Sequence, residues 1–149
     1  MKFAASPNFG PRAEGKEIKY VIIHYTAMES APEALARLCD PAAEVSAHYL
    51  IDKQGEITQM VDERLRAWHA GQSEWEGETD INSCSIGIEL DNKGNEPYPP
   101  LQIEALKTLL EEIKSRHNIG SNAILGHSDI APTRKQDPGP LFPWEEIRG

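Results

Sequence analysis

IKYVIIHY, residues 18–25, is a short run rich in β-branched residues, and its apolar part ends at His24. Such a run predicts a buried strand. A second strand is predicted at SIGIEL, residues 85–90, where isoleucine and leucine recur at every other position. This alternation places Glu89 on the face opposite those apolar side chains, because successive side chains of a strand point to opposite faces.

The rest of the chain supplies helices and further strands around these two. Ser30 and Pro32 predict the start of a short helix through EALARLCD, residues 33–40. The clearest helix is LQIEALKTLLEEIKSRH, residues 101–117, whose apolar side chains recur on one face, with Gly120 expected as the left-handed residue beyond its end. A hairpin is expected through VSAHYLID and EITQMV (residues 45–52 and 56–61), a loop over 64–83, and a last strand through NAILGH (residues 122–127).

This order of elements predicts an α/β fold, with a central mixed β-sheet flanked by helices. A chain of 149 residues fits one domain, so residues 1–149 are expected to form a single unit.

The composition limits the classes of function that the protein can have. The net charge is −9, from 15 basic and 24 acidic residues, which argues against non-specific nucleic-acid binding. No apolar run approaches the ~20 residues that cross a bilayer, and no apolar signal segment follows the first residues. Cys39 and Cys84 are expected to be buried free thiols, in keeping with a reducing compartment. We therefore expect a cytoplasmic monomer, with a periplasmic or outer-membrane-anchored protein lacking its leader as the alternative.

Two histidines each end a run of branched apolar residues: His24 follows VII (residues 21–23) and His127 follows ILG (residues 124–126). Open α/β sheets bind ligands at strand ends, so neighbouring strands would bring the two imidazoles together. Asp137 is a candidate third ligand because prolines stiffen the loop that joins it to His127. Two histidines and one carboxylate leave a fourth position for water, which is typical of catalytic zinc, so a zinc site at the sheet edge is one interpretation. Spacing alone also fits two core histidines satisfied by polar neighbours, so both interpretations stay open.

Two charged residues could complete such a site. Lys135 stands two residues before Asp137, so in an extended segment both side chains point the same way, and a cation there could stabilise an oxyanion. A solvated lysine is the alternative. Glu89, on the polar face of its strand, could act as the general base for a zinc-activated water.

Seven stretches run in order from residue 6 to about residue 144: SPNFGPR, VIIHYTA, VSAHYLID, GEITQMV, AWHAG, INSCSIGIEL and GHSDIAPTRKQDPGP. In this combination the chain resembles the zinc-dependent N-acetylmuramoyl-L-alanine amidases of the AmpD/AmiD type, relatives of phage-lysozyme amidases and of peptidoglycan recognition proteins. The resemblance implies hydrolysis of the amide between the lactyl group of N-acetylmuramic acid, or its 1,6-anhydro form, and L-alanine of the peptidoglycan stem peptide.

Carried over residue by residue, the resemblance implies one zinc ion held by His24, His127 and Asp137. It implies Glu89 as the acid/base carboxylate and Lys135 as the cation facing the oxyanion. Trp68, His69 and Asn82 are then expected to contact substrate, a peptidoglycan fragment. His48 is expected to be structural, inside a strand, and His117 to lie at the surface or to cap its helix.

Two alternative functions would use the same site. A non-catalytic module would bind peptidoglycan fragments without cleaving them, and a different zinc hydrolase would cut within the stem peptide. Among cytosolic relatives, basic side chains are expected near the peptide. Here acidic residues stand instead at Glu44, Glu76, Glu78 and Asp80. If those positions face substrate, they disfavour a carboxylate-rich peptide and suit an amidated or amine-bearing stem.

Overall fold

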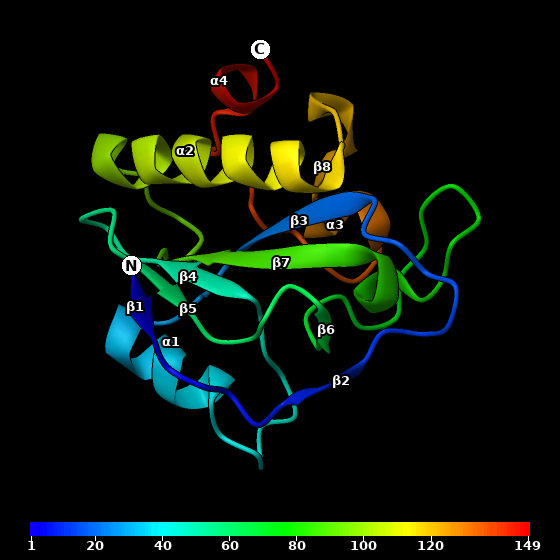
Figure 1. The fold of residues 1–149 in the computed structure, drawn as a ribbon. Coiled ribbons are helices and arrows are strands. Elements are labelled where there is room, and N and C mark those ends of the chain that lie inside the picture. The colour runs from blue at the N-terminus through cyan, green and yellow to red at the C-terminus, as the bar shows by residue number, and fades with distance from the viewer.

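A six-stranded mixed sheet forms the centre of the computed structural model, which describes residues 1–149 (Figure 1). Its strands lie in the order β1 (Lys2–Phe3), β5 (Ile57–Gln59), β4 (Tyr49–Ile51), β7 (Ser85–Leu90), β3 (Tyr20–Tyr25) and β8 (Ile124–Gly126). Four neighbouring strands, β4, β7, β3 and β8, run parallel, whereas β5 is antiparallel to β4. The two strands predicted most directly, β3 and β7, are neighbours at the centre of the sheet.

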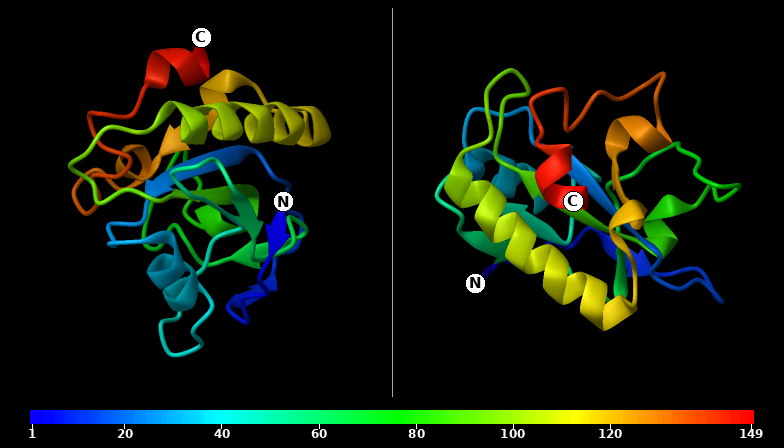
Figure 2. Two further views of the ribbon diagram at one scale, coloured as in Figure 1. Left: turned by 90° about the vertical axis from the view of Figure 1, so that its left-hand side faces the viewer. Right: turned by 90° about the horizontal axis from the view of Figure 1, so that it is seen from above.

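Helices cover both faces of this sheet (Figures 1 and 2). The long helix α2 (Pro100–His117) lies on one face and α1 (Ala31–Leu38) on the other, while the C-terminal helix α4 (Trp144–Arg148) packs on the α2 side. Short helix α3 (His127–Ile130) follows β8 directly. The structure therefore confirms the predicted α/β class. None of its helices combines the length and apolar character needed to span a membrane.

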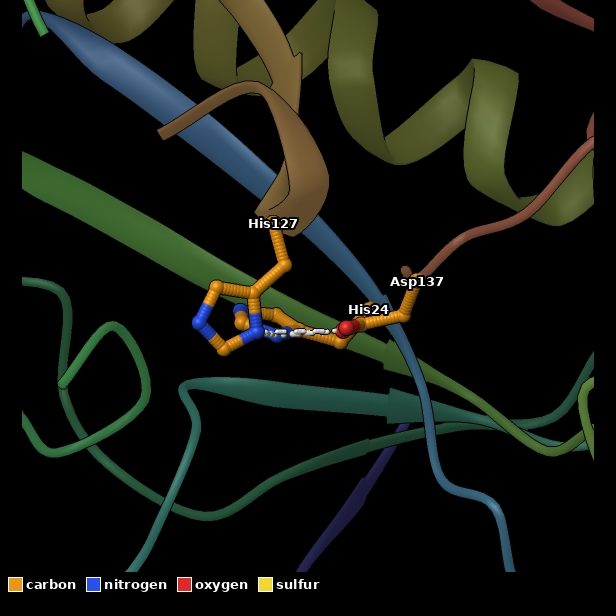
Figure 3. A group of neighbouring side chains, drawn as sticks. All are labelled: His24, His127 and Asp137. Carbon is orange, nitrogen blue, oxygen red and sulfur yellow. Dashed lines mark hydrogen bonds and ion pairs between the residues drawn. The ribbon is translucent and has the colours of Figure 1, made fainter. Parts of the chain in front are cut away.

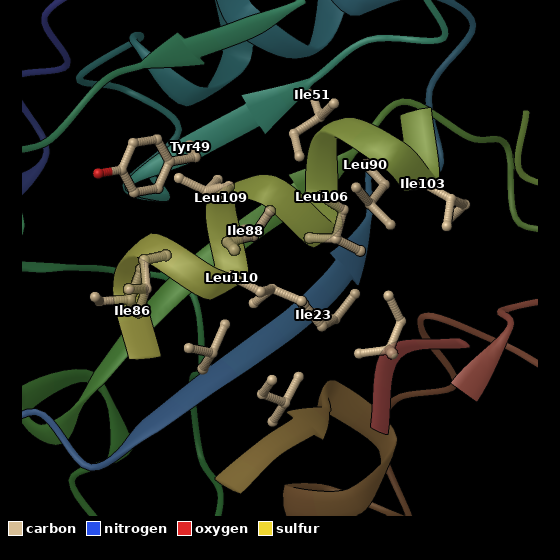
Figure 4. Close-up of a cluster of buried hydrophobic side chains, with 14 of the residues drawn as sticks. Ile23, Tyr49, Ile51, Ile86, Ile88, Leu90, Ile103, Leu106, Leu109 and Leu110 are labelled. Carbon is tan, nitrogen blue, oxygen red and sulfur yellow. The ribbon is translucent and has the colours of Figure 1, made fainter. Parts of the chain in front are cut away.

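The main core lies between the sheet and α2 (Figure 4). Ile86, Ile88 and Leu90 of β7 are fully buried there against leucines of α2. Each such side chain contributes about 1.5–3 kcal/mol through burial. Because apolar residues occupy the α2 face of β7, Glu89 lies on the opposite face, the one that α1 covers in part.

Several boundaries differ from those predicted. The segment 64–83 is not all loop, because β6 (Leu65–Ala67) pairs with β2 (Phe9–Pro11) in a small antiparallel sheet, and a 3-10 turn spans Ile81–Cys84. A second 3-10 turn spans Ser121–Ala123, so the last strand is only β8. The left-handed residue that follows α2 is Asn118, with φ of 53°, and not Gly120 as expected. Asparagine tolerates that conformation because its short side chain can hydrogen-bond locally.

Helix α2 is tied to the sheet by a half-buried cluster around Glu63. Its carboxylate accepts hydrogen bonds from Tyr49 of β4, from Arg116 (2.6 Å) and from His117 (2.7 Å). His117 was expected to lie free at the surface or to cap its helix. Instead it links α2 to the sheet through Glu63. Burial alone would raise the pKa of Glu63, but its bonds with Arg116, Tyr49 and His117 lower it from 4.5 to about 2.

Replacing Glu63 by glutamine is expected to lower the free energy of unfolding by about 3 kcal/mol at pH 7. Because the folded-state pKa is depressed, this stabilisation is complete above the unfolded pKa of 4.5 and is lost as pH falls towards about 2. Urea unfolding at pH 7 and pH 3 should show the two proteins converging in acid. Glu56→Gln, which removes an exposed pair with Lys2, is the control and should change stability by less than about 1 kcal/mol. An equal effect of both substitutions would contradict this account.

Candidate metal centre

Strand register places His24 and Glu89 side by side. They are direct partners on the parallel strands β3 and β7, so their side chains leave the sheet on the same face. His24 is 2% exposed, and its Nδ1 lies 3.8 Å from Glu89 Oε2. The strand-end histidine and the polar-face carboxylate of the sequence therefore meet over one spot on the sheet.

His127 and Asp137 complete this cluster (Figure 3). β8 pairs with β3 so that Gly126 faces Ile23, which sets His127, the first residue of α3, next to His24. Asp137 comes from the loop after α3 and is anchored by the Ser128 N–H donating to its carbonyl at 3.0 Å. The Nδ1 atoms of the two histidines are 2.9 Å apart, and Asp137 Oδ2 lies 3.0 and 3.1 Å from them.

The outer ring nitrogens show how the histidines are oriented. His127 Nε2 is 2.8 Å from the carbonyl oxygen of Ala70, so it must carry the proton and Nδ1 presents a lone pair. His24 Nε2 lies 3.0 Å from His69 Nδ1, and His69 Nε2 lies 3.1 Å from Ser85 Oγ. When His24 donates along this chain, two nitrogen lone pairs and a carboxylate oxygen converge on one point. Tetrahedral ligand atoms about 2.0–2.2 Å from a common ion would be spaced about 3.3–3.6 Å apart, only slightly more than the spacing here, so the cluster fits a single metal ion.

Burial sets the protonation states that such a site needs. It lowers the pKa of His24 to about 4, against the opposing effect of the bond to Asp137. Burial acts to raise the pKa of Asp137, but the close side-chain contacts with His127 and His24 outweigh it and lower that pKa. A neutral imidazole and an ionised carboxylate are the metal-binding forms. Burial, and then the negative charge of Asp137, raise the pKa of Glu89 well above its usual range, while Lys135 opposes them.

The cluster opens into a cavity of ≈ 430 Å³. His24, His127, Asp137 and Glu89 contribute to its lining, and so do Lys135 and Trp68. Helix α1 and the residues after it form another part of the wall, with Ala34, Arg37, Leu38, Val45 and Ser46. Of the substrate-binding residues that the sequence predicts, Trp68 and His69 line this cavity.

Asn82, the third residue expected to contact substrate, does not line the cavity. Its side chain is 8% exposed, and Oδ1 accepts hydrogen bonds from the backbone N–H groups of His69 (3.1 Å) and Ala70 (2.8 Å). Asn82 therefore positions the segment that contacts both metal-centre histidines. His69 has both ring nitrogens occupied, which makes it a support for His24 as well as a wall residue.

Sequence reasoning missed the role of Ser85 and Gly87, although a signal was present. Together with Glu89 they occupy alternate positions on the polar face of β7, and both are small. The space they leave holds the His69 ring: a Cβ at Gly87 would lie 2.4 Å from its Cγ. His48 has a structural role, as expected, but it lies just before β4 and not inside a strand: its Nδ1 accepts from the Gly87 N–H and its Nε2 donates to the Leu65 carbonyl.

The family model described as N-acetylmuramoyl-L-alanine amidase matches residues 14–140, which include every residue of the cluster. The chain belongs to the N-acetylmuramoyl-L-alanine amidase family. It is 43% identical to N-acetylmuramoyl-L-alanine amidase AmiD of Escherichia coli, over 87% of this chain and 52% of that protein. It is 36% identical to 1,6-anhydro-N-acetylmuramyl-L-alanine amidase AmpD of Haemophilus influenzae, over 94% of this chain and 86% of that protein.

Structural comparison agrees with this assignment to the amidase family. The solved complex of E. coli AmiD with its substrate anhydro-N-acetylmuramic acid-L-Ala-D-γ-Glu-L-Lys superimposes with a TM-score of 0.83 and 42% identity, over 91% of this chain and 58% of that one. The chain thus spans little more than half the length of AmiD. The resemblance inferred from the seven sequence stretches is confirmed.

The four acidic residues found where basic side chains were expected do not line the cavity. Glu76 accepts a hydrogen bond from Tyr20, Glu78 pairs with Lys16 and Asp80 with Arg66. Glu44 is exposed and also lies outside the lining. Because these acidic residues do not face the cavity, they give no reason to expect an amidated or amine-bearing stem peptide.

Proposed function

We propose that this protein is a zinc-dependent amidase that hydrolyses the bond between the lactyl group of N-acetylmuramic acid, or its 1,6-anhydro form, and L-alanine of the stem peptide. The observation that carries the proposal is the convergence of His24, His127 and Asp137 within 3.1 Å of one another, with Glu89 beside them, in a member of this family. The substrate in the AmiD complex contains that bond.

The set of donor atoms favours zinc over magnesium or calcium, and it fits a single ion. Two imidazole nitrogens and one carboxylate oxygen match catalytic zinc sites, which keep a further position open, whereas magnesium and calcium prefer oxygen ligands. When bound there, zinc supplies a Lewis acid that activates water and polarises the substrate carbonyl.

The chain's own residues supply the proton transfers. Glu89 takes a proton from the attacking water and later gives it to the departing alanine nitrogen. Its raised pKa helps the carboxyl group to hold that proton between the two steps. Lys135 provides positive charge on the cavity wall for the oxygen on which negative charge develops. Trp68 lies on the same wall, where its ring can pack against the sugar or peptide.

The setting of the reaction is part of the proposal. We propose that residues 1–149 act as one amidase domain, as a monomer in the cytoplasm, on soluble fragments and without nucleic acid. Supporting observations are the net charge of −9, two free cysteines of which Cys84 is buried, and large exposed apolar side chains that are scattered over separate elements.

Product masses test the proposal. Incubation with a purified anhydro-muropeptide is expected to release a free stem peptide beginning with L-alanine. Release should stop after treatment with a zinc chelator and return on addition of zinc. Intact sacculi, assayed in parallel, test whether the substrate extends beyond soluble fragments. Cleavage within the stem would indicate a peptidase instead, and tight binding without cleavage by the zinc-loaded protein would indicate a binding module.

A further inference from the structure

Helix α1 presents a cation to the same cavity. Arg37, in the last turn of α1, is exposed and lies among the lining residues, beside the apolar side chains of Ala34, Leu38 and Val45. An apolar surround strengthens the interaction of a guanidinium with an anion, because fewer waters compete for it.

Arg37 has no partner within the protein. It takes part in no ion pair and in no side-chain hydrogen bond. The carbonyls at the end of α1 are satisfied by other groups: Leu38 by the Ser6 hydroxyl at 2.6 Å, Leu35 by the Cys39 N–H and Arg37 itself by the Asp40 N–H. The guanidinium is therefore not needed as a cap, and its place near the helix C-terminus gives only the weak favourable interaction of any exposed cation with the helix dipole.

The two other cations of the cavity, Arg134 and Lys135, come from the loop that leads to Asp137 and not from α1. Arg134 donates to the carbonyls of Ala70 and Gln72, each at 2.8 Å. Lys135 lines the cavity two residues before the candidate ligand Asp137. The carboxylates of the lining, Glu89 and Asp137, also belong to that centre. The α1 side of the cavity thus carries a free positive charge with no acidic neighbour in the lining.

We propose that Arg37 is a specificity-determining residue that binds a free carboxylate of the stem peptide. The inference rests on the proposed amidase function and names the form of substrate it prefers. In a stem that reads L-Ala-D-γ-Glu, the glutamate is linked through its side chain, which leaves its α-carboxylate free one residue beyond the bond that is cut. A guanidinium offers two parallel N–H groups to such a carboxylate and cannot bind the corresponding carboxamide in that way.

A pair of substrates tests this assignment. One is anhydro-N-acetylmuramic acid-L-Ala-D-γ-Glu-L-Lys, and the other carries an α-carboxamide in place of the glutamate α-carboxylate. We expect the unchanged protein to prefer the acid by about five- to tenfold in kcat/KM, the size of effect given by a partly exposed charged hydrogen bond. In Arg37→Gln this preference should fall to near one, whereas Arg37→Lys should keep part of it. Arg64→Gln, at an exposed arginine paired with Asp62 outside the cavity, is the control and should keep all of it.

A binding measurement separates recognition from turnover. In the Glu89→Gln background, calorimetry should show tighter binding of the acid than of the amide, weakening with salt, and Arg37→Gln should remove the difference. Equal use of the two substrates by the unchanged protein, preference for the amide, or a preference that persists in Arg37→Gln would each overturn the role of Arg37. Failure of the zinc-loaded protein to cleave either substrate would instead count against the proposed function.

Discussion

A protein with glutamine at position 89 is expected to bind zinc as before but to lose about 10²–10⁴-fold in kcat, the usual contribution of a positioned acid/base group. Glutamine keeps the shape of the side chain but can neither accept nor return a proton. Pairing of His24 with Glu89 across β3 and β7 fixes the carboxylate beside the metal cluster, and its Oε2 is 3.8 Å from a candidate ligand atom. Steady-state kinetics on the anhydro-muropeptide provide the measurement.

A measurement of thermal stability distinguishes loss of the acid/base group from misfolding. Burial raises the pKa of Glu89, so in the metal-free protein its ionised form is less stable folded than unfolded. The neutral amide should therefore leave the melting temperature of the metal-free protein unchanged or higher. Glu56→Gln, at an exposed glutamate, should keep full activity. An activity within tenfold of the unchanged protein, with zinc bound, would show that another group moves the proton.

The sequence was most informative where apolar runs are continuous. IKYVIIHY and SIGIEL predicted the two central strands, and the alternation in SIGIEL placed Glu89 on the correct face because that pattern has only one register in which its apolar side is buried. Strands β1, β2 and β6 carried no such signal. They are two or three residues long and depend on partners distant in the chain, which local propensity does not describe.

Contacts between distant loops were also beyond sequence reasoning. The pattern suggested that His24 and His127 could meet, but only the resemblance favoured a metal site over two satisfied core histidines. The support that His69 gives to His24, with Asn82 holding the backbone, joins segments that the spacing of residues does not relate. Whether the acidic residues near the motifs face the cavity could not be decided from the sequence either, because each ion pair they form depends on the folded chain.

His127→Ala is expected to lose both the metal ion and the activity. It removes one of three candidate ligands and leaves His24 and Asp137, which hold a metal ion less tightly and with fewer constraints on geometry. We expect zinc to be lost on dialysis. Activity should then fall by at least about 10³-fold, because the charge stabilisation that the ion supplies is worth several kcal/mol.

His117→Ala provides the matched control for this variant. His117 lies on α2 and bonds to Glu63, away from the cavity, so its removal should cost stability but keep both zinc and turnover. Zinc content by elemental analysis, alongside kcat/KM for both variants, makes the comparison. A His127→Ala protein that retains one tightly bound zinc would show that the ion is held elsewhere. Retention of activity after complete loss of zinc would show that the acid/base carboxylate and the cavity cations suffice without it.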